Sequence, residues 1–336
     1  MTDNKIIIIA EAGVNHNGDL DMARRMVYAA KEAGADYVKF QTAVPELVIS
    51  TFAPKAEYQK NTTGEAESQL EMCKAIHLPL SDYAGLKELC DSVGIGFMST
   101  PFDLVSIDCL APLGMDYWKI PSGEITNLPY LQKIGARGEK IILSTGMATL
   151  AEVETALQVL EKAGTPRSNV YVLHCTTQYP APLESVNLRA MDALATLGCA
   201  GVGYSDHTEG IDVSVAAAAR GAVVIEKHFT LDRNLPGPDH KASLEPAELK
   251  HLVDAVRRVS VMLGSEEKIA ADAERPNMEV ARKSIVASRA IAAGEVFSEE
   301  NICVKRPGNG ISPMRWYDVL GCKAPRDFAP DELIEL

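Results

Sequence analysis

No two cysteines in this 336-residue sequence have the CxxC spacing of a zinc knuckle or of a disulfide oxidoreductase. The seven cysteines are odd in number and scattered along the chain: Cys73, Cys90, Cys109, Cys175, Cys199, Cys303 and Cys322. Scattered thiols of this kind are typical of a reducing compartment, in which disulfides are rare. We therefore expect a cytoplasmic protein whose cysteines are mostly buried and unbridged.

Long apolar runs, a secretory signal and an excess of positive charge are missing as well. The longest apolar segments, such as residues 6–12 and 215–219, are much shorter than the roughly 20 residues that span a bilayer. No basic segment followed by a long apolar one opens the chain, so we expect no signal peptide. The formal net charge of −13 argues against nucleic acid or an anionic membrane as the main partner. An anionic substrate would therefore have to be bound by a local group of cations.

A repeating pattern runs from the N terminus to about Gly264: a short apolar run, a polar cluster, then an amphipathic helix. The apolar runs lie near residues 5–10, 36–40, 95–99, 116–120, 140–144, 170–174, 200–205 and 222–228. Strands that alternate with helices of this length pair in parallel through crossovers. Eight such units predict an α/β protein with a (β/α)8 TIM barrel. An open doubly wound sheet is the alternative, but the GxGxxG fingerprint usual in that class is missing.

The pattern stops after Gly264. Residues 265–282 are polar and predict a linker, whereas residues 283–336 contain short strands and turns. Within this last segment, RAIAAGEVF and RDFAPDELI resemble each other, which indicates a weak internal repeat of two β-turn units. The predicted organisation is a barrel domain over 1–264, a linker over 265–282 and a small domain over 283–336.

Polar residues gather where the predicted barrel strands end, which is where (β/α)8 barrels carry their chemistry. Lys39 and Lys119 follow apolar runs and could bind a phosphate or carboxylate together with hydroxyls from Thr100, Ser122 and Ser144. The alternative is that both lysines are exposed charges. Four carboxylates are available for acid–base work, and composition does not choose among them: Glu11, Glu124, Glu226 and Asp239.

His207 and His228 lie in SDHT and EKHFT, at equivalent ends of two neighbouring predicted strands. Adjacent strands lie ~4.8 Å apart, a distance that two metal–imidazole bonds of ~2.1 Å can bridge. The two histidines could thus hold a divalent ion, with positions left for water and substrate. The alternative is that they are ordinary core or capping histidines.

The segment AEAGVNHNGD, residues 10–19, lacks the Gly-Lys-Ser/Thr ending of a phosphate-binding loop. We expect Gly13 and Gly18 to turn the backbone away from the first strand, and Asn17 or Asp19 to cap the next helix. His16 is expected to have only a supporting role.

In KRPGNG, residues 305–310, a proline and two glycines follow Arg306 and predict a tight turn. Arg306 is then either a solvated basic residue or a contact to an anionic or acylated ligand, in a neighbouring subunit for example.

Taken together, these segments resemble the sialic acid synthase family, whose members condense phosphoenolpyruvate with a sugar to make nine-carbon sugar acids. The resemblance covers nearly the whole chain and rests on ten segments in family order: AEAGVNHNGD, VKFQT, STPFD, KIPSGEITNLPYL, ILSTGMAT, LHCTTQYPAP, GYSDHTEG, IEKHFTLD, GPDHKASLEP and KRPGNGISPM. It implies a TIM barrel followed by a small antifreeze-like (SAF, β-clip type) domain. It also implies a homodimer in which each SAF domain lies over the barrel of its partner.

The resemblance also implies a role for each candidate residue. His207 and His228 would bind manganese or magnesium, and Glu11 would be the catalytic carboxylate. Phosphoenolpyruvate would be surrounded by Lys39, Thr100, Lys119, Ser122 and Ser144. The sugar side, or support of the metal, would fall to Gln41, Glu124, Tyr179, Glu226, Asp239 and, from across the dimer, Arg306. One departure is Thr177, where relatives often carry asparagine, and it puts a phosphate or sugar contact at this position in doubt.

Two sugars fit the implied reaction, and both are open-chain N-acyl hexosamines. N-acetylmannosamine would give N-acetylneuraminate, and 2,4-diacetamido-2,4,6-trideoxymannose would give N,N'-diacetyllegionaminate. One alternative is a phosphoenolpyruvate aldol synthase that makes a seven- or eight-carbon sugar acid, which would need a second phosphate site. A non-enzymatic alternative is a carbohydrate-binding protein.

Overall fold

The structure is a computed structural model that describes residues 5–55 and 68–336. The chain divides into two compact units, Met1–Gly264 and Ser265–Leu336. The first unit contains eight strands: β1 (Ile7–Gly13), β2 (Tyr37–Thr42), β3 (Gly96–Pro101), β4 (Trp118–Ile120), β5 (Ile141–Ser144), β6 (Val170–His174), β7 (Gly201–Asp206) and β8 (Val224–His228). Each lies where an apolar run predicts it.

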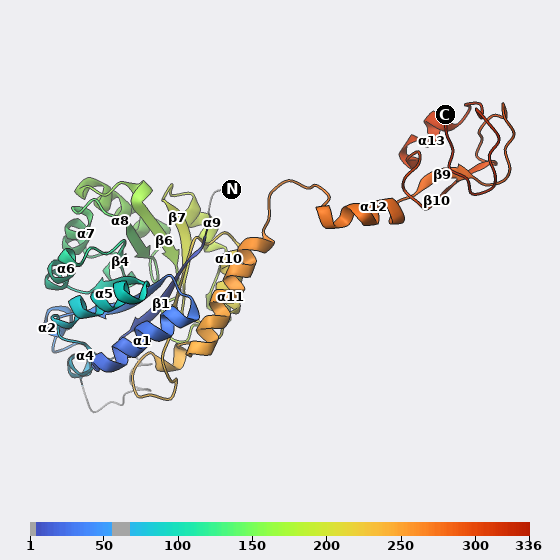
Figure 1. Ribbon diagram of the computed structural model, residues 1–336. Helices are drawn as coiled ribbons and strands as arrows, with labels where there is room; N and C mark the ends of the chain where they lie inside the picture. Colours follow the sequence, from blue (N-terminus) through green and yellow to red (C-terminus); the bar gives the residue numbers. More distant parts are fainter. Residues whose placement is uncertain (1–4, 56–67) are drawn as a thin grey trace. The chain divides into compact units, whose positions relative to one another are not determined.

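The strands form one parallel sheet in the order β3-β2-β1-β8-β7-β6-β5-β4. Figure 1 shows these strands surrounded by helices. The two strands at the ends of this order, β3 and β4, also contact each other, so the sheet closes on itself. The predicted (β/α)8 barrel is confirmed.

Helices surround the barrel: α1 (Leu20–Ala33), α2 (Pro45–Val48), α4 (Gln69–Ile76), α5 (Asp82–Val93), α6 (Leu104–Leu110), α7 (Leu128–Gly135), α8 (Leu150–Ala163), α9 (Ala190–Ala195), α10 (Asp212–Ala219) and α11 (Pro246–Met262). Their ends follow from local chemistry. The Asp19 side chain caps α1 by accepting from two backbone amides, and Gly34 ends the helix with a left-handed φ of 86°. Among residues 5–55 and 68–336, no helix is both long and apolar enough to cross a membrane.

Successive residues of a strand face opposite sides, so each barrel strand has one set of side chains facing the helices and another facing the barrel interior. Outward-facing residues pack against the helices in the main apolar core. Inward-facing residues first build an apolar floor inside the barrel, with Ile9, Met98, Ile142, Leu173 and Val224 as members. Two residues further along the chain, the inward positions hold Glu11, Thr100, Ser144, Glu226 and, directly after β6, Cys175. A polar layer therefore lies directly above an apolar floor, at the carboxyl end of the barrel.

A buried ion pair lies on the outer side of β7 and β8. Lys227 Nζ lies 3.1 Å from Asp206 Oδ2, and both side chains are fully buried. The backbone of Lys227 is in register with that of Asp206. Because neighbouring residues on a strand face opposite sides, the next residues, His207 and His228, lie toward the barrel interior.

The second unit is built around two antiparallel strands, β9 (Ser284–Ala287) and β10 (Ile302–Lys305). It also contains α12 (Arg275–Ala281) and α13 (Trp316–Val319). Helix α12 falls within the segment that the sequence predicts to be a linker. Its end contacts the strand region, because Gly308 N donates to Glu279 O over 2.7 Å.

The internal repeat of the second unit has a structural counterpart. Arg289 pairs with Glu295 at 2.7 Å, and Arg326 pairs with Glu332 at the same distance and the same sequence spacing. The two repeats bridge each other at Ile291 and Phe328. At equivalent turn positions, Gly294 and Asp331 both have positive φ, 83° and 68°. The two similar sequences thus form two similar turns of one small domain.

Candidate active site

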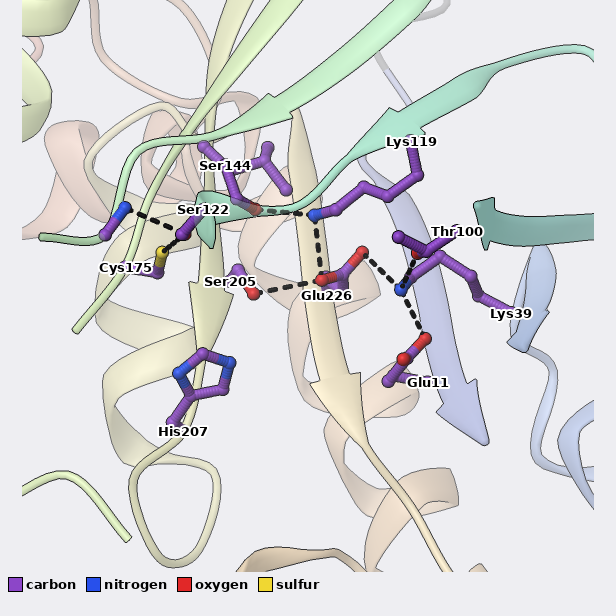
Figure 2. A network of polar contacts seen from close by, with 12 residues as sticks. Glu11, Lys39, Thr100, Lys119, Ser122, Ser144, Cys175, Ser205, His207 and Glu226 are labelled. Carbon is purple, nitrogen blue, oxygen red and sulfur yellow. Dashed lines mark hydrogen bonds and ion pairs between the residues drawn. The ribbon is translucent and has the colours of Figure 1, made fainter. Parts of the chain in front are cut away.

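Two lysines and two glutamates are buried together in the polar layer of the barrel (Figure 2). Lys39 Nζ lies 2.5 Å from Glu11 Oε2 and 3.6 Å from Glu226 Oε2. Lys119 Nζ lies 3.0 Å from Glu226 Oε1. Glu226 is therefore shared between both lysines, and it also accepts from Ser205 Oγ over 3.0 Å. None of the four charged side chains belongs to a residue more than 5% exposed.

The two carboxylates differ in their electrostatic surroundings. Burial raises the pKa of Glu11, and its ion pair with Lys39 offsets only part of this effect. Burial would raise the pKa of Glu226 as well, but Lys119 and Lys39 together outweigh it and hold this pKa well below its usual range. Glu226 is thus kept as an anion that binds the lysines. Glu11 is the carboxyl group that can exchange a proton nearer to neutral pH.

A cavity of about 220 Å³ opens above these charges. Its lining includes Glu11, Lys39, Gln41, Thr100, Phe102, Lys119, Pro121, Ser122, Gly123, Ser144, Met147, Cys175, Thr177, Tyr179, Ser205, His207, Glu226 and His228. A larger cavity of about 480 Å³ lies at the opposite end of the strands, around Ile7 and Val223. We assign the site to the smaller cavity because its lining carries the buried charges, whereas the larger one has a mostly aliphatic lining.

One side of the cavity is rich in hydroxyl groups. Lys119 Nζ donates to Ser144 Oγ over 2.5 Å, and Gly146 N donates to Ser122 Oγ over 2.9 Å. Across the cavity, Lys39 Nζ donates to Thr100 Oγ1 over 3.0 Å. These ammonium and hydroxyl groups are donors suited to phosphate or carboxylate oxygens.

Gly146 lies close to the side chains on the hydroxyl-rich side of the cavity. A Cβ atom at this position would lie 2.2 Å from Thr177 Oγ1, 2.9 Å from Ser122 Oγ and 3.0 Å from Cys175 Sγ. Any larger residue would therefore displace side chains that line the cavity.

His207 and His228 lie together at the mouth, with ring centroids 5.6 Å apart, and the ring of Tyr179 lies 4.2 Å from that of His207. Burial lowers the pKa of His207 to about 4 and that of His228 well below its usual value. Both imidazoles are thus neutral at neutral pH, the form that binds metal ions.

The hydrogen bonds of the two rings fit metal ligands. His207 Nδ1 lies 2.7 Å from Thr176 O, and because a carbonyl only accepts, this nitrogen carries the proton and leaves Nε2 as the ligand atom. His228 Nδ1 is buried without a hydrogen-bond partner in the part of the chain that the structure describes. Within residues 5–55 and 68–336, no group of three or more His, Cys, Asp or Glu side chains is placed to hold a metal. An ion bound by His207 and His228 would take further ligands from water or substrate oxygens.

Three predicted site residues do not line this cavity. Glu124 is partly buried and accepts from Asn127 Nδ2 over 2.6 Å. Asp239 is buried in the segment between β8 and α11, and burial raises its pKa to about 6. Arg306 belongs to the second unit, where its Nε donates to Ala281 O over 3.1 Å.

A profile of the NeuB family matches residues 26–268, which is more than half of the chain. The chain belongs to the NeuB family. A profile of the SAF domain matches residues 282–335, so the predicted antifreeze-like domain is confirmed as well.

Relatives of this NeuB-family protein align with it over nearly its full length. It is 54% identical to the N,N'-diacetyllegionaminic acid synthase of Campylobacter jejuni, over 98% of this chain and 99% of the relative. It is 49% identical to the N,N'-diacetyllegionaminic acid synthase of Legionella pneumophila, over 94% of this chain and 89% of the relative. The crystal structure of the N-acetylneuraminic acid synthetase of Leptospira borgpetersenii in complex with citrate is 34% identical. Its TM-score is 0.71, over 82% of this chain and 90% of that one.

Several residues that line the cavity of this NeuB-family protein were not predicted as site residues. Ser205 and Cys175 could have been found, because they occupy inward positions two residues from His207 and Leu173 on their strands. Phe102 and Met147 lie in loops after β3 and β5, where no periodicity tells which side chain faces the cavity.

Replacement of Gly146 by alanine should weaken the binding of a phosphate- or carboxylate-bearing anion in this cavity about 10- to 100-fold, because the new Cβ displaces Ser122 and Thr177. Isothermal titration calorimetry with phosphoenolpyruvate as the probe anion measures the effect. Gly123→Ala is a matched control, since Gly123 lines the same cavity and its new Cβ would meet no heavy atom within 4 Å. Equal affinity in both variants would show that the packing around Gly146 has no part in binding.

Proposed function

We propose that this protein condenses phosphoenolpyruvate with 2,4-diacetamido-2,4,6-trideoxymannose to give N,N'-diacetyllegionaminate and phosphate. The observation that carries the proposal is that two relatives about half identical to the chain, from different bacteria, are both N,N'-diacetyllegionaminic acid synthases. The likeness to an N-acetylneuraminic acid synthetase is lower, at 34% identity. The shared class of reaction is the condensation that makes nine-carbon sugar acids.

Phosphoenolpyruvate would lie among Lys39, Lys119 and the hydroxyls of Thr100, Ser122 and Ser144. The charges of the cluster support a further cation in this site. Lys39 and Lys119 are already balanced by Glu11 and Glu226, so the four groups carry no net positive charge while both carboxylates are ionised. Phosphoenolpyruvate brings a phosphate and a carboxylate, and buried anions require compensation. A divalent ion at the two histidines would supply it.

We include manganese or magnesium in the proposal, held by His207 and His228. Such an ion, when bound, would polarise the aldehyde oxygen of the open-chain sugar as a Lewis acid. His207 contributes the orientation of its ring through its bond to Thr176 O. Gln41 and Tyr179 border the same part of the cavity and would contact the sugar.

The bonds that form and break in the proposed reaction indicate the role of Glu11. C3 of phosphoenolpyruvate forms a bond to the aldehyde carbon of the sugar, and the aldehyde oxygen takes up a proton. Water then adds to the electron-deficient C2 and loses one proton. The C2 hydroxyl so formed passes its remaining proton to the phosphate as the C2–O bond to phosphate breaks, which leaves a ketone at C2 and free phosphate. We assign the removal of the water proton to Glu11, since its raised pKa suits a general base near neutral pH. Gln41 Nε2 donates to Glu11 Oε1 over 3.1 Å and holds the carboxylate in place.

Phosphate release from phosphoenolpyruvate tests the proposed reaction. Release should be fastest with 2,4-diacetamido-2,4,6-trideoxymannose, slower with N-acetylmannosamine and absent with a phosphorylated aldose. EDTA should abolish it, and added Mn²⁺ or Mg²⁺ should restore it. Mass spectrometry of the product identifies the sugar acid. Release that needs neither sugar nor metal would overturn the proposed function.

The Glu11→Gln protein should bind phosphoenolpyruvate and sugar but turn over roughly 10²- to 10⁴-fold more slowly, because an amide cannot accept the water proton. Steady-state kinetics and calorimetry of both substrates measure this. Glu46→Gln is the control, at a carboxylate on α2 outside the cavity lining. Turnover at the wild-type rate in Glu11→Gln would remove Glu11 from the mechanism.

We extend the proposal to a homodimer in which Arg306 of the partner subunit contacts the N-acyl group of the sugar. Large apolar side chains are exposed on segments that follow the barrel strands, and they support the proposal that a second subunit covers this end of the barrel. Phe52 is 94% exposed, Met147 72% and Leu183 69%. Of these, Met147 also lines the cavity, and exposed apolar side chains beside a binding site are typical of a contact surface.

Mixed dimers test this arrangement. Glu11→Gln and Arg306→Ala proteins should each be nearly inactive on their own. A mixed dimer, purified through two different affinity tags, should regain roughly half of the wild-type activity, because one of its two sites has both residues. If each chain uses its own Arg306, no site in the mixed dimer has both residues and activity stays low.

A further inference from the structure

The segment between β8 and α11, residues 229–245, is long for a connection in a barrel. Apart from the short helix His240–Ala242, it has no regular structure of its own. Connections of this length in compact domains usually carry function. This segment, called here the β8 loop, contains Asp239.

Two asparagines of the loop that follows β1 hold the β8 loop. Asn15 Nδ2 donates to Phe229 O and to Ser243 Oγ, both over 2.9 Å, and so ties the two ends of the β8 loop together. Asn17 Nδ2 donates to Pro236 O over 2.7 Å, in the middle of the loop. Asp19, and not Asn17, caps α1, so the helix cap does not account for Asn17.

His240 connects Asn17 to the start of the β8 loop. Its Nε2 lies 3.3 Å from Asn17 Oδ1, and its Nδ1 lies 2.7 Å from Thr230 Oγ1. The Asn17 amide nitrogen is directed at Pro236 O, so Oδ1 is the acceptor and His240 Nε2 carries the proton. Nδ1 then accepts from the Thr230 hydroxyl. Burial lowers the pKa of His240 to about 4, which agrees with a neutral ring that donates once and accepts once.

The backbone around this contact has unusual conformations. Asn17 has a left-handed φ of 50°, which is uncommon for residues other than glycine. At Gly237, a Cβ atom would lie 2.7 Å from the His240 ring and 2.9 Å from Asn17 Oδ1. Backbone strain of this kind persists where the surroundings hold it in place, and it is frequent at functional sites.

Asp239 is a buried carboxylate of the β8 loop that lacks a partner. It is 8% exposed, and its carboxylate makes no hydrogen bond or ion pair within residues 5–55 and 68–336, so that burial alone raises its pKa. Its backbone oxygen, in contrast, accepts from Ser243 Oγ over 2.7 Å, the same hydroxyl that receives Asn15 Nδ2. The backbone of Asp239 is held, whereas its buried carboxylate lacks a hydrogen-bond donor. Sugar hydroxyl and amide N–H groups are donors of the kind it lacks.

We propose that Asn17 and His240 are positioning residues that clamp the β8 loop, so that Asp239 presents its carboxylate to donor groups of the acylamino sugar. The inference rests on the proposed function, since it takes the ligand of Asp239 to be the sugar substrate. Asn17 and His240 do not contact the reacting atoms and act through Asp239.

Asn17→Gly tests the clamp without loss of the backbone conformation, because glycine adopts a φ of 50° without strain. The variant loses both side-chain contacts of Asn17. We expect KM for the sugar to rise about 10-fold, with kcat and KM for phosphoenolpyruvate little changed. Asn187→Gly is the matched control, since Asn187 also has a left-handed φ, of 44°, and lies in the connection before α9.

A second variant separates positioning from general stability. In an Asp239→Ala background, Asn17→Gly should leave KM for the sugar unchanged, because residues that act through one another are not additive. A further 10-fold rise in that background would show that Asn17 acts by another route and would overturn the inference. So would a lower unfolding temperature of Asn17→Gly with both KM values unchanged.

Failure of the clamp and failure of the proposed function would give different results. If the wild-type protein releases no phosphate with any N-acyl sugar, the proposed function is wrong. If the wild type is active and Asn17→Gly matches Asn187→Gly in every kinetic constant, only the clamp is wrong.

Discussion

Two buried lysines and two buried glutamates at the carboxyl end of the barrel must neutralise one another, and the site depends on this balance. An isolated buried charge is costly, so each of the four groups needs its partners at close range. Glu226 binds both lysines and stays ionised, while Glu11 binds Lys39 alone and has the raised pKa. While both carboxylates are ionised, the same balance leaves no spare positive charge for an anionic substrate. The cation that we propose at the two histidines would supply it.

Barrel closure brings the two ends of the domain together at this site. Glu11 lies on the first strand and is in register with His228 on the last, and Phe229 N donates to Glu11 O over 2.9 Å. The loop after β1 then continues the contact, since Asn15 and Asn17 hold the β8 loop. On the outer side, the Asp206–Lys227 pair joins the two strands that carry the histidines. One short segment near the N terminus thus contributes both to the proposed chemistry and to the support of the last loop.

Much of the fold and part of the site could be predicted because both follow from short-range periodicity. The eight strands were found from apolar runs, and inward positions such as Lys39, Lys119 and Glu226 from their place at strand ends. Loop residues had no such periodicity. Met147 lines the cavity unpredicted, while Glu124 and Asp239 were predicted and do not line it. Asn17 and Asp19 were equal candidates for the helix cap, and only the folded backbone assigned the cap to Asp19.

The sequence by itself determined the class of fold, the small second domain and the family, because strand and helix periods and ordered motifs are local properties of the chain. Only the tertiary structure decided which polar groups compete for which partners. The pKa difference between Glu11 and Glu226, the neutral state of the two histidines and the unpaired buried carboxylate of Asp239 all depend on burial and on neighbours distant in sequence. Electrostatic energies are set by distances in space, and the sequence does not specify those distances until the barrel closes.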